Sequence, residues 1–180
     1  MTEFRDADHV VVGVGGIGGG VAYWLAKLVQ DAGRETTIVG LEQFALGHDK
    51  GASHDHSRII RYSYHTPEYV KLASEAYETW DAVAAEAREQ LVVRTGGIDL
   101  FPTNSAISID DYISSLSVNN VAFEVLDAAE TMSRFPQFVL DDGVRSLFQQ
   151  DTGIAAAIKG TAAHQRLARA RGVELHEGVT

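Results

Sequence analysis

A run of glycines after a short β-branched segment constrains the fold of this chain more than any other feature. The residues Gly13-Val14-Gly15-Gly16-Ile17-Gly18 follow His9–Val12 and precede a stretch with helical periodicity. Gly13 permits a tight turn out of a strand, Gly15 lets the backbone approach a pyrophosphate, and Gly18 lets a helix pack close to a sheet. The start of that helix presents unpaired N–H groups to phosphates. The pattern predicts a strand–turn–helix unit that binds a dinucleotide.

The second strand of this unit is predicted to end in a carboxylate. Leu41-Glu42 lies 24 residues beyond Gly18, at the spacing where a carboxylate accepts hydrogen bonds from ribose hydroxyls. Its charge would repel a 2′-phosphate on the same ribose. The alternative is a glycine-rich turn beside a Glu42 that is merely solvated. The glycine pattern by itself does not distinguish NAD from FAD.

Hydrophobic periodicity predicts alternating strands and helices in the first part of the chain. His9–Val12 has the composition of a buried strand, and Thr36–Leu41 that of a second strand. Between them, Ile17–Gln30 is predicted to be a helix that ends at Gly33. Residues 44–57 form a polar loop in this interpretation.

A long helix is predicted to begin at Thr66-Pro67, with Thr66 as its N-cap and Pro67 at its first position. Its apolar residues recur with a period of 3.6, which predicts the face that packs into the core. This stripe consists of Tyr69, Leu72, Ala76, Trp80 and Val83.

The middle of the chain has short strand-like runs separated by turns. These runs are Leu91–Arg94, Ile98–Phe101 and Val121–Val125. Two pairs, Ser108/Asp111 and Asp127/Glu130, have the N-cap and N3 spacing of helix starts. The pattern is typical of an inserted antiparallel domain rather than of a continued β–α–β unit.

After this insertion the chain returns to the first pattern. A helix is predicted from about Ile154 to Arg171, and a strand over Val173–Glu177. The expected fold class is therefore α/β, with a Rossmann-like β–α–β unit and an inserted, partly antiparallel segment. The expected domains are residues 1–90 with 146–180, and residues 91–145.

Composition excludes several classes of function. The net charge is −10, from 15 basic and 25 acidic residues, so nucleic acid and anionic membranes are poor partners. Without cysteine the chain forms no disulfide, thiolate metal site or cysteinyl cofactor linkage, which fits a reducing compartment. Residues 10–26 carry no charge, but six glycines between Gly13 and Gly20 argue against a signal or membrane segment.

Donor side chains concentrate in residues 50–64, which we call the histidine–arginine loop. Within it, Arg58 and Arg61 flank two isoleucines, and a guanidinium is the planar, permanently charged partner that a carboxylate prefers. This suggests an anion site. The alternative is a pair of structural arginines that bridge local carboxylates. A metal site on His48, His54 and His56 would need a fourth ligand, and we expect no metal.

Together these motifs resemble monomeric sarcosine oxidase and its relatives, which include N-methyltryptophan oxidase and pipecolate oxidase, in the D-amino-acid-oxidase-like FAD superfamily. The run Ser53-His54-x-x-Ser57-Arg58-Ile59-Ile60-Arg61 is specific. The resemblance extends over essentially the whole chain. Its other segments are Gly13-x-Gly15-x-x-Gly18, Leu41-Glu42-Gln43-Phe44, His48-x-x-Gly51-Ala52, Tyr69-Val70, Thr95-Gly96-Gly97, Asp151-x-Gly153 and Arg171-Gly172.

The resemblance implies roles for the residues of the histidine–arginine loop. His54 and Arg58 are expected near the isoalloxazine ring of FAD as catalytic residues, because a cation there favours the anionic reduced flavin. Ser53 is expected near the flavin or the pyrophosphate. Arg61 is expected to hold the substrate carboxylate and so orient the substrate over the ring. The remaining cofactor-binding residues would be Gly13, Gly15, Ile17, Gly18 and Glu42.

The resemblance also implies an activity. The intact protein would oxidise the C–N bond of a secondary or N-methyl amino acid to an imine, with molecular oxygen as acceptor and hydrogen peroxide as product. Residues 1–90 and 146–180 would be part of the FAD-binding domain, and residues 91–145 part of the substrate domain. We expect a cytoplasmic protein, monomeric when intact, that binds an amino-acid substrate but no nucleic acid or membrane.

The sequence departs from the family in two respects. Asp55 stands where the family usually has glycine, and its carboxylate can oppose Arg58. Family chains are roughly twice as long, so this chain resembles an N-terminal portion that lacks the flavin-linking cysteine and the lysine thought to activate oxygen. FAD would then be held non-covalently on this chain. The alternatives are an amine dehydrogenase with another acceptor and an inactive nucleotide-binding fragment.

Overall fold

The computed structural model describes residues 6–180, so the first five residues of the expected domain 1–90 lie outside the described part. The chain divides into two compact units. The first contains the residues up to Arg58, 83–91 and 155–180, and the second contains 59–82 and 92–154. This division differs from the expected one, because 59–82 and 146–154 fall in the second unit. Which unit serves the cofactor and which the substrate stays a prediction.

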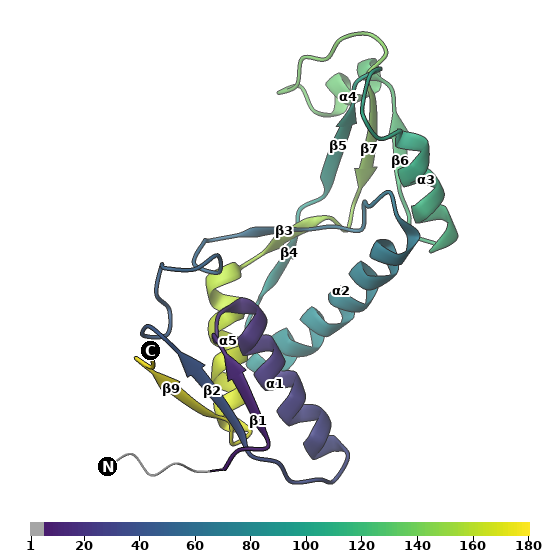
Figure 1. Cartoon of the computed structure of the whole chain (residues 1–180). Coiled ribbons are helices and arrows are strands. Elements are labelled where there is room, and N and C mark those ends of the chain that lie inside the picture. Colours follow the sequence, from purple (N-terminus) through teal and green to yellow (C-terminus); the bar gives the residue numbers. More distant parts are fainter. Residues whose placement is uncertain (1–5) are drawn as a thin grey trace. The chain divides into compact units, whose positions relative to one another are not determined.

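The first unit contains a three-stranded parallel sheet. Its strands β1 (His9–Val12), β2 (Ile38–Glu42) and β9 (Glu174–Glu177) follow the order β1-β2-β9, with β2 in the centre (Figure 1). The helices α1 (Gly16–Asp31) and α5 (Ala157–Ala170) pack against each other. The succession β1-α1-β2 confirms the predicted Rossmann-like unit.

Local signals explain most of these bounds. α1 ends shortly before Gly33, whose φ of +65° is a conformation that terminates a helix. The helix extends one residue further at each end than the predicted Ile17–Gln30. β2 begins two residues later than predicted, and the Thr37 N–H just before it donates to the Asp8 carboxylate at 2.8 Å.

The prediction that β1 is a buried strand is wrong for this chain. Val10 and Val12 are 55% and 83% exposed. Successive side chains of a strand point to opposite faces, and Val11 is the one that faces α1, within reach of Gly18. β1 is also an edge strand of the sheet formed by the described residues. Neither its outer edge nor the face with Val10 and Val12 is therefore covered there.

The second unit contains an antiparallel sheet with the order β5-β7-β6. Its strands are β5 (Gly97–Phe101), β6 (Glu124–Leu126) and β7 (Arg145–Gln149). The unit also carries the helices α3 (Ile109–Val118) and α4 (Ala128–Arg134). The antiparallel character of the insertion is thus confirmed.

Both helix starts predicted in this unit are confirmed. Ser108 accepts a hydrogen bond from the Asp110 N–H at 3.1 Å. Asp127 and Glu130 form a complete capping box, with reciprocal bonds of 2.8 and 3.1 Å. Each cap satisfies backbone donors that the helix leaves free, which is worth about 1 kcal/mol.

A third sheet contains β3 (Arg58–Ile60), β4 (Val92–Arg94) and β8 (Gly153–Ala155), in the order β3-β8-β4. The prediction of a helix from Ile154 is wrong at its start, because this residue lies in β8 and α5 begins three residues later. A Cβ on the first residue of β8 would overlap the Val93 carbonyl oxygen, so glycine is required for this pairing.

The helix α2 (Pro67–Ala87) begins at the predicted proline, but of the predicted stripe only Val83 is buried. Tyr69 and Leu72 are both 58% exposed, whereas Val70 is fully buried. The buried apolar residues of the helix are Val70, Ala73, Tyr77 and Val83. Val70 belongs to a core cluster of the second unit with Phe101, Ile109, Leu116 and Leu147. In the first part of the helix the buried positions are therefore shifted by one residue from the predicted ones, to Val70, Ala73 and Tyr77.

Candidate functional site

The phosphate loop, Gly13–Gly18, forms the turn between β1 and α1. Gly13 has a φ of +81°, a left-handed conformation that other residues rarely adopt. A Cβ on Gly18 would overlap the Gly13 carbonyl oxygen, so α1 lies this close to the strand only with glycine at that position. Both glycines therefore meet the geometric requirements inferred from the sequence.

The N-terminus of α1 receives no side-chain hydrogen bond from its own N-cap residue. Gly15 is the N-cap, and the first turn carries no acidic residue. The Gly16 N–H donates to Ser53 Oγ at 2.9 Å, and a Cβ on Gly15 or Gly16 would crowd this hydroxyl. The Ile17 side chain is 87% exposed. A helix N-terminus with an adjacent hydroxyl suits a phosphate.

Glu42 lies at the end of β2 and is bound to the phosphate loop. Its Oε2 accepts from the Val14 N–H at 2.9 Å, and its Oε1 accepts from the Phe44 N–H at 3.2 Å. Glu42 is 7% exposed, so the alternative of a solvated carboxylate is wrong. Burial raises the pKa of Glu42, but the hydrogen bonds from Val14 and Phe44 and the nearby His48 outweigh it and hold the pKa below its usual value.

Gln165 is a site residue that the sequence analysis missed. It lies on α5, is buried, and its Nε2 donates to the Val14 carbonyl at 2.6 Å. The Val14 backbone is thus held by Glu42 at its N–H and by Gln165 at its carbonyl. No local pattern marks Gln165, because its partner lies 151 positions earlier in the chain.

These residues surround a hollow of about 80 Å³. The predicted site residues that line it are Gly15, Glu42, Ser53 and His54, together with Thr161 and Gln165 from α5. Pockets that enclose a small ligand measure about 300–1,000 Å³, so this hollow has room for only part of a dinucleotide. A helix N-terminus, hydroxyls and an ionised carboxylate fit the pyrophosphate and the adjoining ribose of FAD.

A larger hollow of about 350 Å³ lies at the opposite end of β2. Thr36, Thr37 and Arg171 are among the residues that line it, and none of the predicted site residues does. Ligands of parallel α/β sheets bind at the carboxyl ends of the strands. This hollow is therefore not part of the candidate site.

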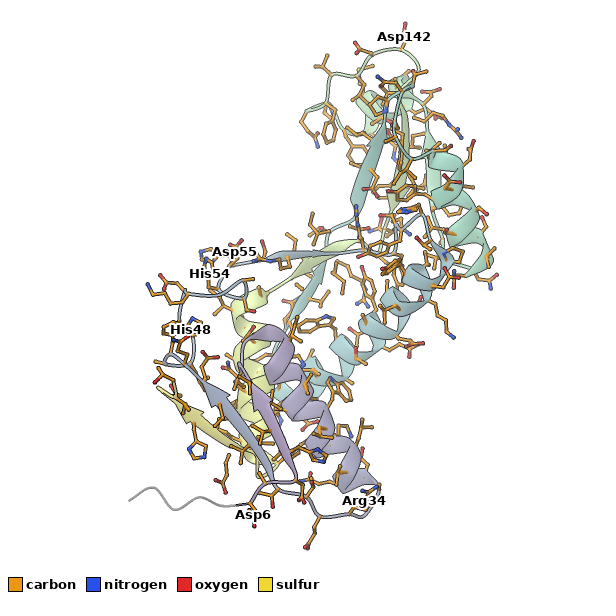
Figure 2. The ribbon with its side chains drawn as sticks, in the orientation of Figure 1. Asp6, Arg34, His48, His54, Asp55 and Asp142 are labelled. Atoms are coloured by element: carbon orange, nitrogen blue, oxygen red, sulfur yellow. The ribbon has the colours of Figure 1, made fainter. Side chains whose placement is uncertain are left out.

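His54 lies on the histidine–arginine loop, next to Asp55 (Figure 2). Its Nδ1 is 2.6 Å from the Gly51 carbonyl oxygen. Because a carbonyl oxygen only accepts, Nδ1 is protonated and donates a hydrogen bond to it. His54 is exposed but lines the hollow beside Ser53. The structure thus brings His54 and Ser53 to the phosphate loop.

Arg58 is bound within its own loop. Its guanidinium donates to Asp55 Oδ2 at 2.6 Å and to the carbonyls of Ser57 and Ala52 at 2.8 and 2.7 Å. The His56 N–H and then Arg58 hold the pKa of Asp55 below its usual value. The carboxylate that departs from the family pattern therefore neutralises Arg58, and Arg58 does not line the hollow.

Arg61 belongs to the second unit, where it also meets a carboxylate. Its Nη1 donates to Asp99 Oδ1 at 2.9 Å, with side-chain exposures of 37% and 27%. The guanidinium lies 5.3 Å from the centre of the Tyr64 ring. Both arginines thus pair with carboxylates of this chain, as the alternative of structural arginines requires. Their predicted roles toward flavin and substrate stay predictions.

His48, His54 and His56 do not form a metal site in the part of the chain described. Between residues 6 and 180, no three His, Cys, Asp or Glu side chains gather closely enough to hold a metal ion. His48 contacts Glu42 and His54 contacts Gly51 instead. In the same residues, no helix is long and apolar enough to cross a membrane.

The chain belongs to the FAD dependent oxidoreductase family, whose model matches residues 8–180. This confirms the resemblance inferred from the motifs. The family is FAD-dependent.

Within this family the chain is similar to sarcosine oxidases. It is 31% identical over 170 residues to the monomeric sarcosine oxidase of Streptomyces avermitilis, and 33% identical over 171 residues to the peroxisomal sarcosine oxidase of Homo sapiens. It is 29% identical over 166 residues to N-methyl-L-tryptophan oxidase of Salmonella arizonae. These matches cover 94%, 95% and 92% of this chain but 42–43% of the relatives. The chain therefore spans less than half the length of the relatives it matches.

Solved structures agree on the fold. NikD, an unusual amino acid oxidase essential for nikkomycin biosynthesis, superposes with a TM-score of 0.81 at 23% identity. L-proline dehydrogenase from P. horikoshii superposes with a TM-score of 0.78 at 18% identity. Both matches cover 97% of this chain and 44% of the other. The α/β fold of the chain is thus the fold of the corresponding portion of these proteins.

Proposed function

We propose that the intact protein containing this chain is an FAD-dependent oxidase of a secondary or N-methyl amino acid. The observation that carries the proposal is the buried, ionised Glu42 bound to a phosphate loop at the N-terminus of α1, in a chain of this family. The similarity to proteins named sarcosine oxidase and N-methyl-L-tryptophan oxidase supports the substrate class.

Different residues of this chain would bind different parts of FAD. The amides of the phosphate loop and the Ser53 hydroxyl would bind the pyrophosphate, and Glu42 would accept hydrogen bonds from the ribose. His54 and Arg58 would lie near the isoalloxazine ring. When bound, FAD would accept the two electrons and the hydrogen of the substrate C–H bond as a hydride equivalent, while the amine would release its N–H proton to give the imine. Oxygen would then take two electrons and two protons to give hydrogen peroxide.

Arg61 would bind the substrate carboxylate. A carboxylate that enters a closed site loses its hydration, and a charge-assisted pair with a guanidinium replaces it. Asp99 bonds to Nη1 of Arg61, whereas a guanidinium offers five N–H donors in a planar fork. The remaining donors are sufficient for a second carboxylate. Asp99 and the substrate could therefore share Arg61.

The proposal is tested by anaerobic mixing of the purified protein, in the longest polypeptide that carries this chain, with sarcosine, pipecolate and other N-methyl amino acids. We expect bleaching of the flavin absorbance by at least one of them, and hydrogen peroxide once oxygen is admitted. Absence of flavin reduction by every amine would refute the proposal. Fast reduction with negligible peroxide would identify an amine dehydrogenase with another acceptor.

A second candidate function applies to the 180-residue chain by itself. Since it spans about 42% of its relatives, it could bind the nucleotide without turnover. Purification of this chain distinguishes the two, because turnover of an amine by it would exclude a merely nucleotide-binding fragment.

We further propose that the intact protein is monomeric and cytoplasmic. Several relatives are named monomeric sarcosine oxidase, while the mouse and human relatives are named peroxisomal. Sedimentation velocity and cell fractionation test the two statements. A dimer, or cofractionation with an organelle, would contradict them.

A further inference from the structure

Asp99 places a carboxylate beside the core cluster of the second unit. It lies on β5 opposite Leu147 of β7 (Figure 1), and opposite residues of an antiparallel pair project from the same face of the sheet. Phe101, two positions further along β5, projects from that face as well. Both Phe101 and Leu147 are buried members of the core cluster. Packing alone does not explain a charged side chain at this position.

The ion pair of Asp99 with Arg61 is shielded from water. Among the ion pairs of the second unit within residues 6–180, Asp99 has the least exposed carboxylate, at 27%. The carboxylates that pair with Arg94, Arg134 and Arg145 are 53–72% exposed. Charges that are partly shielded interact more strongly with a further charge, because less water and salt screen them. A ligand that reaches this pair is therefore recognised by its own charges.

A single hydrogen bond joins the two side chains. Arg61 Nη1 donates to Asp99 Oδ1 at 2.9 Å, and within residues 6–180 neither side chain forms a second hydrogen bond. An arginine–carboxylate pair can instead be bidentate, with both carboxylate oxygens engaged. Here Oδ2 of Asp99 and the remaining guanidinium N–H groups are left for other partners.

The charges of this pair are complementary to those of an amino acid. A free amino acid carries a carboxylate and an ammonium group at neutral pH. Its nitrogen and the nearer carboxylate oxygen are about 2.7 Å apart, as the N–C, C–C and C–O bond lengths require. Nη1 of Arg61 and Oδ1 of Asp99 are 2.9 Å apart. An amino acid aligned with the pair can thus place its carboxylate at the guanidinium and its nitrogen at the aspartate.

We propose that Asp99 is a specificity-determining residue that accepts a hydrogen bond from the substrate nitrogen while Arg61 binds the substrate carboxylate. The pair binds both polar ends of an amino acid. It disfavours a carboxylic acid without an amine, because the negative charge of that ligand meets Asp99 without a compensating donor. The inference rests on the proposed function, because it requires the substrate carboxylate at Arg61.

The test compares an amino acid with its ether analogue, in which oxygen replaces the amine nitrogen. The best amino-acid substrate is used; the analogue of sarcosine is methoxyacetate, and that of pipecolate is tetrahydropyran-2-carboxylate. The protein is the longest polypeptide that carries this chain, with FAD bound. Affinity for the amino acid is taken from the concentration dependence of anaerobic flavin reduction, and affinity for the analogue from the change in flavin absorbance.

Two substitutions are compared with the unsubstituted protein. Asp99→Asn removes the charge but keeps the size of the side chain and an oxygen for the bond from Arg61. Asp81→Asn is the matched control, because it removes the carboxylate from another aspartate–arginine pair of the second unit, the one with Arg94. FAD content and thermal unfolding are recorded for each variant.

We expect Asp99→Asn to weaken binding of the amino acid by about 10- to 100-fold, the effect of one hydrogen bond between charged groups. Binding of the ether analogue should become about fivefold tighter or more, because the repulsion is removed. Asp81→Asn should change neither affinity by more than about twofold. The unsubstituted protein should bind the amino acid at least about 10-fold more tightly than the analogue.

The opposite signs of the two changes distinguish specificity from structure. If Asp99 only held Arg61 in place, Asp99→Asn would weaken both ligands together, and this result would overturn the inference. Unchanged affinities in Asp99→Asn would overturn it as well. If that variant does not fold, equal affinities of the unsubstituted protein for the two ligands would do so. Absence of flavin reduction by every amine would instead refute the proposed function, and the inference with it.

Discussion

The phosphate loop and the histidine–arginine loop both carry predicted cofactor contacts, but different interactions hold them. At the phosphate loop, Glu42 and Gln165 reach the Val14 backbone across 28 and 151 positions of the chain, and all three are buried. In the histidine–arginine loop, Arg58 is exposed, and its guanidinium bonds to partners within six positions.

This difference separates a preformed region from one that can exchange its partners. Buried polar groups that lose a partner destabilise a protein by about 1–3 kcal/mol each, so the phosphate loop resists rearrangement. Exposed ion pairs contribute little, so Arg58 can move to a flavin at small cost. Arg61 is partly buried with Asp99 but keeps further N–H donors for a substrate. Substitutions in the first region should therefore change nucleotide binding and stability together, and those in the second should mainly change the chemistry.

The largest effect is expected at Arg61. Arg61→Met should lower kcat/KM for an amino-acid substrate by about 3–5 kcal/mol, because the substrate carboxylate is left buried without its charged partner. Arg61→Lys keeps the charge but loses the planar fork, so it should mainly raise KM. Steady-state kinetics on a catalytically complete protein measure both, with the FAD content as a check that the fold is intact.

The control for Arg61 is a substrate without a carboxylate. The decarboxylated amine should be nearly indifferent to either substitution. Equal losses on both substrates would show that Arg61 is a structural partner of Asp99 and that the comparison between the two regions is wrong on this point.

The next largest effect is expected for Gly18→Ala. The added Cβ would overlap the Gly13 carbonyl oxygen, so we expect a loss of about 3 kcal/mol in the free energy of unfolding and loss of FAD binding. Gly20→Ala is the control in the same helix, where the nearest atom, of His164, is 4.0 Å away. It should stabilise the protein by up to about 1 kcal/mol. Urea unfolding distinguishes them, and equal effects would contradict a preformed phosphate loop.

A smaller effect is expected for Glu42→Ala. The substitution should weaken FAD binding by about 1–3 kcal/mol, because ribose donors and the Val14 N–H lose their acceptor. Glu35→Ala, on an exposed glutamate, should bind FAD normally. The measurement is the dissociation constant of FAD. A nicotinamide cofactor extracted from the protein would refute both this prediction and the assignment of FAD.

The stabilising effect of Glu42 should also depend on pH. Its pKa in the folded state lies below the ordinary value of 4.5, so folding favours the ionised form. The contribution should be complete above about pH 4.5 and be lost as the pH falls through the lower folded-state pKa. Unfolding of the unsubstituted protein and of Glu42→Gln at several pH values tests this. A difference between them that grows toward low pH would contradict it.

The smallest effect on stability is expected for Asp55→Gly. Asp55 and Arg58 are 57% and 47% exposed in their side chains, so thermal unfolding should be nearly unchanged. The freed Arg58 should raise the midpoint potential of bound FAD, whereas Arg58→Met should lower it. Redox titration measures both. A large loss of stability in Asp55→Gly would show that the histidine–arginine loop contributes as much to stability as the phosphate loop.

Much of this protein could be predicted from local patterns alone. The turn at Gly13 and the close approach at Gly18 depend on backbone geometry that glycine alone permits. The start of α3 at Ser108 and the capping box at Asp127 depend on hydrogen bonds between residues a few positions apart. Glu42 was found because β2 and the phosphate loop stand at a fixed spacing within one β–α–β unit. These features are short-range, so the sequence determines them.

Tertiary structure determined the rest, because it depends on which distant segments meet. Periodicity predicted an apolar face for α2, but the core cluster around Val70 selected a different one. β7 escaped prediction because two of its buried side chains, Ser146 and Gln149, are polar. The contact of Gln165 with Val14 and the pairing of Arg61 with Asp99 join positions far apart in the chain. Such contacts leave no periodic trace in the sequence, since each depends on packing that forms only when the chain folds.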